Sequence, residues 1–392
     1  MLSAKSAETI RATLPAVGGA IAEISSVFYD KLFAAHPELL RDLFNRGNQA
    51  NGTQQQALAG AIAAFATALV ENPDTPPETM LNRIAHKHAS LGIARDQYYV
   101  VHTHLFAAIS EVLGEAVTDD VAAAWSEVYW LLADSLSSIE DRLYAESDHP
   151  GTWRDYRVVG RYAETDDAIT LLARPADGLP VPSRLPGQYV SVQVELPDGA
   201  RQIRQYSLTG TRTDAVEFTV KNARGTPDGE VSGHLHRHVT EGDLLQLSAP
   251  FGDVTLDEGD GPVLLASAGI GCTPMIGMLG HLASTDSPRQ VVAVHADRSE
   301  RTHARRAEFD QLVTKLPNAT GHVWYEAPEA EHPGDRTGLV DLSTLNIPEG
   351  TTAYLCGPLP FLRALRAQLL DRGVPADDIR YEVFGPDMWL AR

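Results

Sequence analysis

The sequence has few cysteines and no long apolar run. Its 392 residues include two cysteines, Cys272 and Cys356, too few for a disulfide framework or a thiolate zinc site. No segment approaches the ~18 consecutive apolar residues of a membrane-spanning helix. The N-terminal stretch, Met1 to Leu14, carries charges throughout and lacks the apolar core of a signal peptide. These absences predict a soluble, cytoplasmic protein with no obligate membrane partner.

Positive charge is also scarce. The chain has 32 Lys and Arg against 52 Asp and Glu, so its formal net charge is −20. Nucleic acid and anionic membranes would be repelled rather than neutralised, which argues against both as partners. A local basic pocket for a nucleotide remains compatible with this charge. Hydrophobic residues make up 43% and charged residues 21%, which is typical of globular proteins.

The composition of the chain and the spacing of its apolar residues change near residue 148. Residues 1–148 are rich in Ala and space their apolar residues as helices do, whereas the remainder is dense in Gly and Pro. Thr53-Gln-Gln-Gln56 and Thr75-Pro-Pro-Glu78 match the capping box, so each predicts a helix start. The polar Pro/Gly segment at 145–152 predicts a linker. The first part is therefore predicted to be an all-α domain of about six to eight helices.

The second part divides again. Closely spaced short apolar runs, with one short helix near 229–238, predict a small antiparallel β-barrel over residues 152–260. From residue 261 to 392 strands alternate with helices, which predicts a parallel sheet covered by helices on both faces. The predicted strands of the barrel are 156–162, 169–173, 189–194, 204–209, 217–221 and 244–248, and those of the last domain begin with 263–268 and 291–296. The expected fold is multidomain: all-α, antiparallel barrel, then α/β.

His88 is the first candidate functional residue. It lies on the apolar stripe of a predicted helix, in register with Leu81 and Ile84, where a polar ring is costly without a partner. Haem iron could be that partner, since an imidazole nitrogen can ligate it. A core histidine bonded to the backbone is the commoner explanation for a lone histidine. His86 lies about 200° around the same helix and is expected to face solvent.

Other residues of the first domain are equally unspecific when taken one at a time. Gln54 and Leu58 lie on the core stripe of their helix, and Tyr29 flanks another stripe; first-turn and edge-of-core positions explain them equally well. In order, however, they resemble the globin domain of flavohaemoglobins. The resemblance is carried by Phe44-Asn-Arg-Gly-Asn-Gln-Ala-Asn-Gly-Thr-Gln54 followed by Leu58, and by Arg83-Ile-Ala-His-Lys-His88.

This resemblance implies a haem b pocket. His88 would be the iron ligand, with Tyr98 and Glu140 behind it as the catalytic tyrosine and glutamate. A carboxylate bonded through this network would make the imidazole more electron-rich. Taken alone, Glu140 would be explained as a solvated charge on a helix flank. The remaining implied residues are Phe44 packing on the porphyrin, Tyr29, Gln54 and Leu58 lining the distal pocket, with Tyr29 catalytic, and Lys87 tuning the redox behaviour.

In the barrel, Arg204-Gln-Tyr-Ser207 follows Pro186-Gly-Gln-Tyr189, and Gly229-Glu-Val-Ser232 opens the predicted short helix. Strand alternation puts Arg204 and Tyr206 on one face, where a guanidinium can pair with pyrophosphate and a ring can pack on a flavin. Helix-terminal amides can meet phosphate. An ordinary amphipathic strand would show the same alternation. The ordered pair resembles the FAD motifs of the ferredoxin-reductase-like superfamily, which implies that FAD is bound by Tyr189, Arg204, Gln205, Tyr206, Ser207, Gly229, Glu230, Val231 and Ser232.

The last domain contains a glycine turn between a strand and a helix, in Leu264-Leu-Ala-Ser-Ala-Gly-Ile-Gly-Cys-Thr-Pro274. Two glycines permit close approach of a dinucleotide. The turn ends in Pro and so departs from the dehydrogenase fingerprint, but it resembles the reductase superfamily's version. The implied NAD(P)H contacts are Gly269, Ile270, Gly271, Cys272, Thr273, Pro274, Cys356, Gly357 and Pro358, although small apolar packing is the preferred explanation for Cys272.

Two further points concern the nucleotide and flavin. Glu382 and Phe384 match the segment that covers the flavin in relatives, whereas Val383 stands where relatives often have cysteine. Asp297, after the second strand, would repel a 2′-phosphate, but the neighbouring Arg298 could pair with one. The choice between NADH and NADPH therefore stays open, with a lean to NADH.

The resemblance covers nearly the whole chain in the family's domain order. It implies a monomeric NAD(P)H-dependent nitric oxide dioxygenase, in which electrons pass from NAD(P)H through FAD to haem and O₂ and NO become nitrate. Two alternatives remain. One is a flavohaemoglobin subgroup that oxidises another donor such as lactate, and the other is a haem-based O₂ or NO sensor. A sensor would need an output module, but residues 153–392 resemble a reductase.

Overall fold

The computed structural model describes residues 2–73, 75–147, 151–225, 228–329 and 334–385. The chain forms two compact units. One combines Met1–Asp148 with Glu195–Ile203, and the other combines His149–Val194 with Arg204–Gly385. The predicted domain boundaries at 148, 152 and 260 stay predictions.

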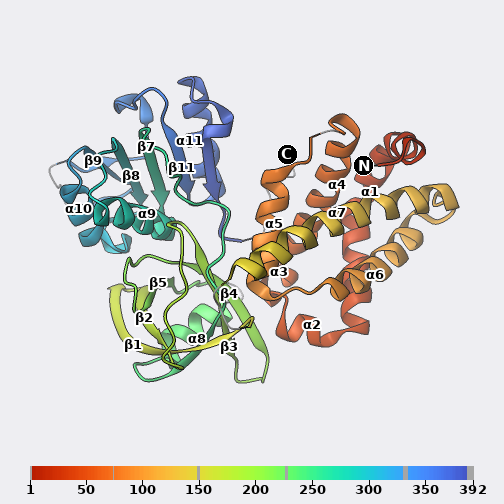
Figure 1. Cartoon of the computed structure of the whole chain (residues 1–392), viewed down its shortest axis with the longest axis horizontal. Coiled ribbons are helices and arrows are strands. Elements are labelled where there is room, and N and C mark those ends of the chain that lie inside the picture. The colour runs from red at the N-terminus through yellow and green to blue at the C-terminus, as the bar shows by residue number, and fades with distance from the viewer. Residues whose placement is uncertain (1, 74, 148–150, 226–227, 330–333, 386–392) are drawn as a thin grey trace. The chain divides into compact units, whose positions relative to one another are not determined.

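The first unit is helical, as expected. Its helices, coloured red to yellow in Figure 1, are α1 (Ala4–Ala35), α2 (Pro37–Asp42), α3 (Arg46–Ala50), α4 (Thr53–Glu71), α5 (Glu78–Leu91), α6 (Arg95–Leu113), the 3₁₀ helix η1 (Gly114–Ala116) and α7 (Asp119–Glu146). α1 packs against α4, α6 and α7, and α5 packs against α7. One core of apolar side chains from these helices fills the unit.

The length and hydropathy of α1 alone would allow it to cross a membrane. Its apolar residues instead supply the centre of the helical core: Ile10, Ile24 and Leu32 are fully buried there. These residues form the stripe with which α1 faces three other helices, although only 28% of its apolar window is buried.

Both predicted capping boxes are wrong. α4 is preceded by Gly52 in the left-handed conformation (φ 76°), and no side chain caps the helix. Thr53 is already helical, and its hydroxyl donates to Asn51 Oδ1 at 2.7 Å. α5 begins only at Glu78, because each of two consecutive prolines pushes the residue before it away from helical conformation.

A buried side chain ties the segment Glu195–Ile203 to the helices of the same unit. Gln202 is 1% exposed, and its Nε2 donates to the carbonyls of Leu40, Arg41 and Phe44 at 3.0–3.3 Å. These carbonyls stand at and just beyond the end of α2, where helix carbonyls lack partners. Gln202 therefore caps α2 from a distant part of the chain.

The strands form two sheets, which lie in the second unit except for residue 195 and residues 201–203. The first has strands β1 (Arg154–Thr165), β2 (Ala168–Pro175), β3 (Tyr189–Glu195), β4 (Arg201–Ser207), β5 (Val216–Lys221) and β6 (Leu244–Leu247), in the order β4-β3-β6-β1-β2-β5. An antiparallel bridge between Leu208 and Phe218 links the chain after β4 to β5, which closes the sheet into the expected barrel. The predicted short helix is α8 (Glu230–His238).

The second sheet is parallel throughout its described pairs. Its order is β10-β9-β8-β7-β11-β12, with β7 (Val263–Ala268), β8 (Val291–Asp297), β9 (Ala319–Tyr325), β10 (Arg336–Thr337), β11 (Thr352–Cys356) and β12 (Ile379–Glu382). Helices α9 (Cys272–Ser284) and α10 (Arg306–Lys315) share a core with one face, and α11 (Leu359–Asp371) packs on β11 and β12. Short 3₁₀ turns are η2 (Gly269–Gly271), η3 (Glu300–Thr302), η4 (Leu342–Thr344) and η5 (Ala376–Asp378).

Arg305 links the two sheets within this unit. It precedes α10 with a left-handed backbone (φ 63°), is nearly buried, and donates to Glu217 Oε1 of β5 at 2.7 Å and to Thr170 Oγ1 of β2 at 3.0 Å. Glu308 also pairs with it. A buried guanidinium is costly without such partners. The barrel strand β5 therefore supplies a negative charge that stabilises Arg305 before α10.

Candidate functional site

Three side chains from consecutive long helices meet at His88. His88 Nδ1 lies 2.8 Å from Glu140 Oε1 and 3.0 Å from the Tyr98 hydroxyl, which itself donates to Glu140 Oε1 at 2.6 Å. They come from α5, α6 and α7 respectively. Glu140 is 2% exposed, so this carboxylate is buried and held by two donors. Burial, and then the charge of Glu140, raise the pKa of Tyr98, which keeps its proton and donates.

This arrangement orients the imidazole of His88. Because Nδ1 donates to a carboxylate, Nε2 is left as the nitrogen that can bind a metal. The side chain of His88 is 30% exposed, whereas in the same stripe Leu81 is buried and Ile84 is partly buried. No group of three or more His, Cys, Asp or Glu in the described residues could hold a metal ion. An iron bound by His88 would therefore need most of its ligands from a porphyrin, and this donor set fits haem.

The neighbours of His88 on α5 differ from one expectation. His86 was expected to face solvent, but it is partly buried and has an interaction partner, as does Lys87. Ser90 Oγ donates to the Lys87 carbonyl at 2.8 Å.

Tyr29 lies in the core at the expected distal position on α1. Burial raises the pKa of its hydroxyl, although Gln54 and Gln49 approach it and favour the ionised form. Tyr29 is therefore protonated at neutral pH and can donate. Its ring meets that of Phe44 edge-on, with centroids 5.8 Å apart. Leu58, one turn after Gln54 on α4, is partly buried against the same core.

Gln49 is a candidate distal residue that the sequence did not identify. Its Nε2 is buried and makes no hydrogen bond of good geometry among the described residues, although the Gln49 side chain approaches the Tyr29 hydroxyl. Its Oε1 accepts from Gln55 Nε2 at 3.1 Å. A buried amide donor beside Tyr29 is costly unless something fills its hydrogen bond, which fits a polar ligand in this pocket. Gln49 belongs to α3, a helix of five residues, which is too short to show periodicity.

In the barrel, β4 presents the predicted flavin residues on two faces. Gln205 Nε2 donates to Ser191 Oγ at 2.8 Å, which directs Gln205 towards β3 and leaves Arg204 and Tyr206 on the opposite face. The Tyr206 ring stacks on Phe218, with centroids 5.5 Å apart and planes 26° apart. Ser207 and Tyr189 are buried. The face with one cation and one stacked aromatic ring fits a flavin carrying pyrophosphate.

Gly229 is the N-cap residue of α8, at a position where no side chain would fit. A Cβ at this position would lie 2.5 Å from Ser232 Oγ and 2.7 Å from Ala223 Cβ. Ser232 accepts from the Ala223 amide at 3.1 Å, so it holds the approaching loop. Val231 is fully buried, and Glu230 is partly buried in the first turn. The first-turn amides of α8, which lack helical partners, suit a phosphate group.

The glycine turn and the segment Cys356–Pro358 lie side by side. β7 and β11 are parallel neighbours, with Ser267 opposite Cys356, so the two segments leave the same edge of the sheet. A Cβ on Gly271 would lie 2.4 Å from the Cys356 carbonyl oxygen. Only glycine permits this approach. The edge is also where the strand order reverses, the usual nucleotide position in such sheets.

Other residues of this turn shape its backbone. Gly269 has a φ of 55°, and Thr273 Oγ1 donates to the Ile270 carbonyl at 3.0 Å. Pro274 is buried in the first turn of α9. Gly357, whose Cβ would lie 3.0 Å from Ala268 Cβ, and Pro358, the N-cap of α11, complete the facing loop.

Both cysteines are packed thiols. Cys272 and Cys356 are free and buried. Burial raises the pKa of Cys272 to about 12 and that of Cys356 well above its usual value. Since the thiolate is the reactive form, neither side chain is a nucleophile near neutral pH. This agrees with the packing explanation for Cys272.

Asp297 ends β8 with its carboxylate held inward. Oδ1 accepts from Thr302 Oγ1 at 2.5 Å and from the Arg298 amide at 2.7 Å. Burial opposes ionisation, but the nearby imidazole of His295, 3.6 Å from Oδ2, and the hydrogen bond from Thr302 lower the pKa of Asp297. This buried carboxylate does not by itself distinguish NADH from NADPH.

Near the end of the described residues, Glu382 of β12 lies opposite Cys356 of the parallel neighbour β11. Phe384, two residues further, is 49% exposed. An exposed aromatic ring beyond the edge that carries the glycine turn can cover a planar ligand.

The chain resembles known proteins over almost its whole length. A globin family model matches residues 26–136, and an oxidoreductase NAD-binding domain model matches residues 265–367. The flavohemoproteins of Bordetella pertussis and Chromobacterium violaceum are 43% and 41% identical, and each alignment covers 98% of this chain and at least 98% of the relative.

Two solved structures are similar as well. The flavohemoglobin of Malassezia yamatoensis, solved with bound FAD and haem, has a TM-score of 0.92 at 37% identity, covering 98% of this chain and all of that one. The FAD/NAD-binding domain of nitric oxide dioxygenase from Vibrio cholerae has a TM-score of 0.57 at 34% identity, covering 60% of this chain and all of that one.

Proposed function

Because the chain belongs to the flavohaemoglobin family, and is thus an oxidoreductase with globin, flavin and nucleotide-binding parts, we propose that it is a nitric oxide dioxygenase. The overall reaction is 2 NO + 2 O₂ + NAD(P)H → 2 NO₃⁻ + NAD(P)⁺ + H⁺. NAD(P)H supplies two electrons, one for each nitrate formed. The single observation that best supports the proposal is the buried network of His88, Tyr98 and Glu140.

The proposal needs haem b and FAD, and the residues present fit both. When bound, haem supplies the iron at which O₂ and NO react, and FAD converts a hydride into single electrons. His88 would hold the iron, with Phe44 against the porphyrin. Arg204, Tyr206 and the N-terminus of α8 would hold FAD, and the Gly269–Pro274 turn with Cys356–Pro358 would hold NAD(P)H.

On the proximal side, the chain orients and polarises one imidazole. Glu140 accepts the Nδ1 proton of His88, and Tyr98 donates to the same oxygen. A hydrogen-bonded carboxylate raises the basicity of the ring and fixes its plane. His88 is therefore a stronger electron donor than an imidazole bonded to a neutral carbonyl.

On the distal side, Tyr29 offers a proton that it does not lose. Its raised pKa keeps the hydroxyl as a donor at neutral pH, and Gln54 and Gln49 lie beside it. Donors placed in an apolar pocket stabilise negative charge that develops on oxygen during the reaction. The surrounding apolar residues exclude water.

Nitrate formation is the decisive experiment. Purified protein with haem and FAD, NADH in excess, O₂ and NO should yield two nitrates per NADH. His88→Ala should abolish nitrate while FAD stays bound, and His86→Ala, on the same helix, is the matched control. Reduction of the flavin by lactate, with no nitrate formed from NADH, NO and O₂, would favour the subgroup that oxidises other donors such as lactate. Gas binding without turnover would favour a sensor.

We also propose that the protein is a cytoplasmic monomer with domains at 1–148, 152–260 and 261–392. The net charge of −20 supports the absence of nucleic-acid or anionic-membrane partners. Light scattering at micromolar concentration tests the monomer, since a mass near twice 42.4 kDa would contradict it.

A further inference from the structure

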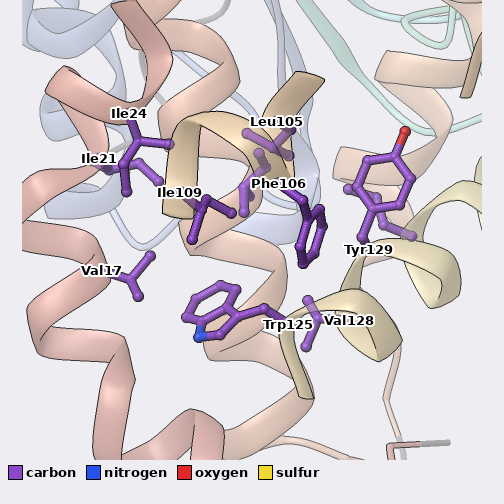
Figure 2. Close-up of a pocket in the computed structure, with 11 residues that line it drawn as sticks. Val17, Ile21, Ile24, Leu105, Phe106, Ile109, Trp125, Val128 and Tyr129 are labelled. Carbon is purple, nitrogen blue, oxygen red and sulfur yellow. The ribbon is translucent and has the colours of Figure 1, made fainter. Parts of the chain in front are cut away.

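The two units differ in what their side chains offer to a further charged ligand. In the helical unit, mostly apolar side chains of α1, α4, α6 and α7 line a pocket (Figure 2). The polar side-chain atoms in its wall are engaged: Trp125 Nε1 donates to Thr13 Oγ1 at 3.1 Å, and the Tyr129 hydroxyl donates to the Tyr98 carbonyl at 2.6 Å. The wall of this pocket therefore has no side-chain group that could hold an ion. Helix α8 of the other unit does carry such groups.

α8 presents two imidazoles on one face. His234 and His238 are four residues apart in this helix, so their side chains are neighbours on its surface. Their ring centroids are 5.2 Å apart, and the ring planes are inclined by 49°. His234 is half-buried and His238 is exposed, so an ion can reach the pair from solvent. His236 lies between them in sequence, but its Nε2 is 2.9 Å from the Val220 carbonyl oxygen of β5.

The separation of the two rings fits one metal ion between them. With Zn–N bonds of about 2.0–2.1 Å, an ion lies about 3.2 Å from each ring centroid, and a tetrahedral angle then separates the centroids by about 5.2 Å. The rings of His234 and His238 already stand at this separation. Imidazole nitrogen suits Zn²⁺, Ni²⁺ and Cu²⁺, whereas Mg²⁺ and Ca²⁺ prefer oxygen ligands.

One nitrogen of His234 lacks a partner. Its Nδ1 is buried and makes no hydrogen bond with the described residues. A buried polar atom without a partner costs free energy, and an ion bound there would supply one. Burial, and then the nearby charges of His238 and Arg237, lower the pKa of His234, so its ring is neutral at pH 7. Neutral imidazole is the form that binds a metal.

We propose that His234 and His238 bind one divalent transition-metal ion, Zn²⁺, Ni²⁺ or Cu²⁺, with water in the remaining positions. Two protein ligands are fewer than the three or four of catalytic and structural zinc sites, so the bound ion exchanges with ions in solution. Cu²⁺ should bind most tightly of the three, as the Irving–Williams order requires.

The ion would fasten the helix whose first turn suits a phosphate group of FAD. α8 has nine residues, and a helix of this length is marginal by itself. The helix dipole favours a cation at its last turn and an anion at its first. An ion that bridges His234 and His238 requires the helical spacing, so its binding stabilises folded α8. The occupied site should therefore slow the release of FAD.

Arg237 opposes the ion. Its guanidinium lies over Gly233, where a Cβ would be 2.8 Å from both terminal nitrogens. A positive charge thus stands beside His234, and it repels a dication. Removing this charge should tighten metal binding, which gives the proposal a variant with the opposite sign.

Metal titration tests the site without any turnover. The full-length holoprotein is titrated with Zn²⁺ by isothermal titration calorimetry, in a buffer that does not bind zinc. His234→Gln and His238→Gln should each weaken the tightest zinc binding at least tenfold, and Arg237→Gln should strengthen it severalfold. No saturable binding in the wild type, or unchanged binding in either histidine variant, would overturn the proposal.

His104→Gln is the matched control. Its ring is 5.4 Å from that of His36 in the helical unit, but the two rings meet edge-on, and His36 Nδ1 lies 3.3 Å from Glu38 Oε1. This variant should bind zinc as the wild type does, and a loss of binding would move the ion to the helical unit. Mg²⁺ that binds as tightly as Zn²⁺ would show that oxygen ligands hold the ion, which would also overturn the proposal.

Flavin fluorescence tests the consequence for FAD. After dilution of the holoprotein, the rise in fluorescence that marks FAD release should be severalfold slower with saturating Zn²⁺ than with EDTA. Zinc should have no such effect on His238→Gln, a change at an exposed residue that should leave the fold intact. Equal release rates with zinc and with EDTA in the wild type would overturn the link between the ion and the flavin.

Discussion

At the scale of single residues, Tyr29 is the side chain whose chemistry depends most on burial. Burial raises the pKa of its hydroxyl, which therefore donates throughout the physiological range. A hydrogen bond to a partly charged oxygen is worth roughly 1.5–3 kcal/mol. At about 1.4 kcal/mol per tenfold, Tyr29→Phe should release O₂ on the order of ten- to a hundredfold faster.

Stopped-flow O₂ dissociation from the reduced Tyr29→Phe variant measures this effect. Haem content should barely change because the ring remains. NADH-driven reduction of an artificial acceptor at the flavin is the internal control and should equal that of the wild type. A dissociation rate within a factor of two of the wild type would mean that Gln54 and Gln49 are the principal donors.

Cys272 predicts a pH dependence at the alkaline end. Its folded-state pKa is raised to about 12, whereas an unfolded thiol titrates near about 8.5. Between these values the folded state keeps a proton that the unfolded state loses, so stability falls as pH rises above about 9. The slope from one such group is about 1.4 kcal/mol per pH unit.

Urea unfolding at pH 7.5, 9 and 10 tests the sign and the slope. Cys272→Ala should lower stability at pH 7.5 because a side chain is lost, but should lose less stability between pH 9 and 10 than the wild type. A parallel decline in the two proteins would show that Cys272 does not titrate between its folded and unfolded states.

At the scale of elements, α2 depends on a residue about 160 positions away. Gln202 donates to three carbonyls around the end of this helix and accepts from the Arg46 amide at 3.4 Å. Gln202→Leu would remove these hydrogen bonds, at about 1–3 kcal/mol for each group that water does not reach. We expect the helical unit to lose at least about 2 kcal/mol of stability.

Urea unfolding followed by circular dichroism at 222 nm measures this loss. Arg46→Ala is the control, since it removes the partly exposed ion pair with Asp198, keeps the backbone amide that donates to Gln202, and should cost no more than about 1 kcal/mol. A Gln202→Leu midpoint equal to that of Arg46→Ala would show that water replaces the lost hydrogen bonds.

Elements also show where sequence reasoning succeeded and where it failed. The strands of the barrel and the first two strands of the parallel sheet, β7 and β8, were predictable, because the pattern of apolar residues in each reflects its burial. The start of α4 at Thr53 was predictable too, but its cap was not, because Gly52 precedes the helix and no side chain caps it. The start of α5 was not predictable from a capping box, because two prolines delay it to Glu78. Gln49 and Gln202 act through contacts made by the fold, which leave no periodic signal.

At the scale of the whole molecule, each predicted site draws on one of the two units. His88, Tyr98 and Glu140 belong to the helical unit, whereas the glycine turn and the Cys356 loop belong to the other. Periodicity could place these residues on helices and strands, but only the resemblance to a family assigned their roles. The structure brings His88, Tyr98 and Glu140 within hydrogen-bonding distance. It also brings the glycine turn and the Cys356 loop to one edge of a sheet.

Because the sites use residues of different units, the flavin site can be altered without touching His88 and its partners. The last prediction uses this to test the electron path. Arg204 and Tyr206 share the face of β4 that fits FAD, and neither belongs to the helical unit. Replacing both by Ala should remove the cation for the pyrophosphate and the ring for the flavin, so FAD is lost. The haem should keep its absorption spectrum and should bind O₂ after reduction by dithionite, because His88 and its partners are untouched. Reduction of the haem by NADH should fall at least a hundredfold, since no flavin remains to convert hydride into single electrons.

Gln193→Ala, a change on the neighbouring strand β3, is the control for general damage to the barrel. The measurement is anaerobic stopped-flow absorbance with NADH as the only reductant. If the double variant reduces haem at the wild-type rate, electrons do not pass through this face of the barrel, and the flavin site must be sought elsewhere.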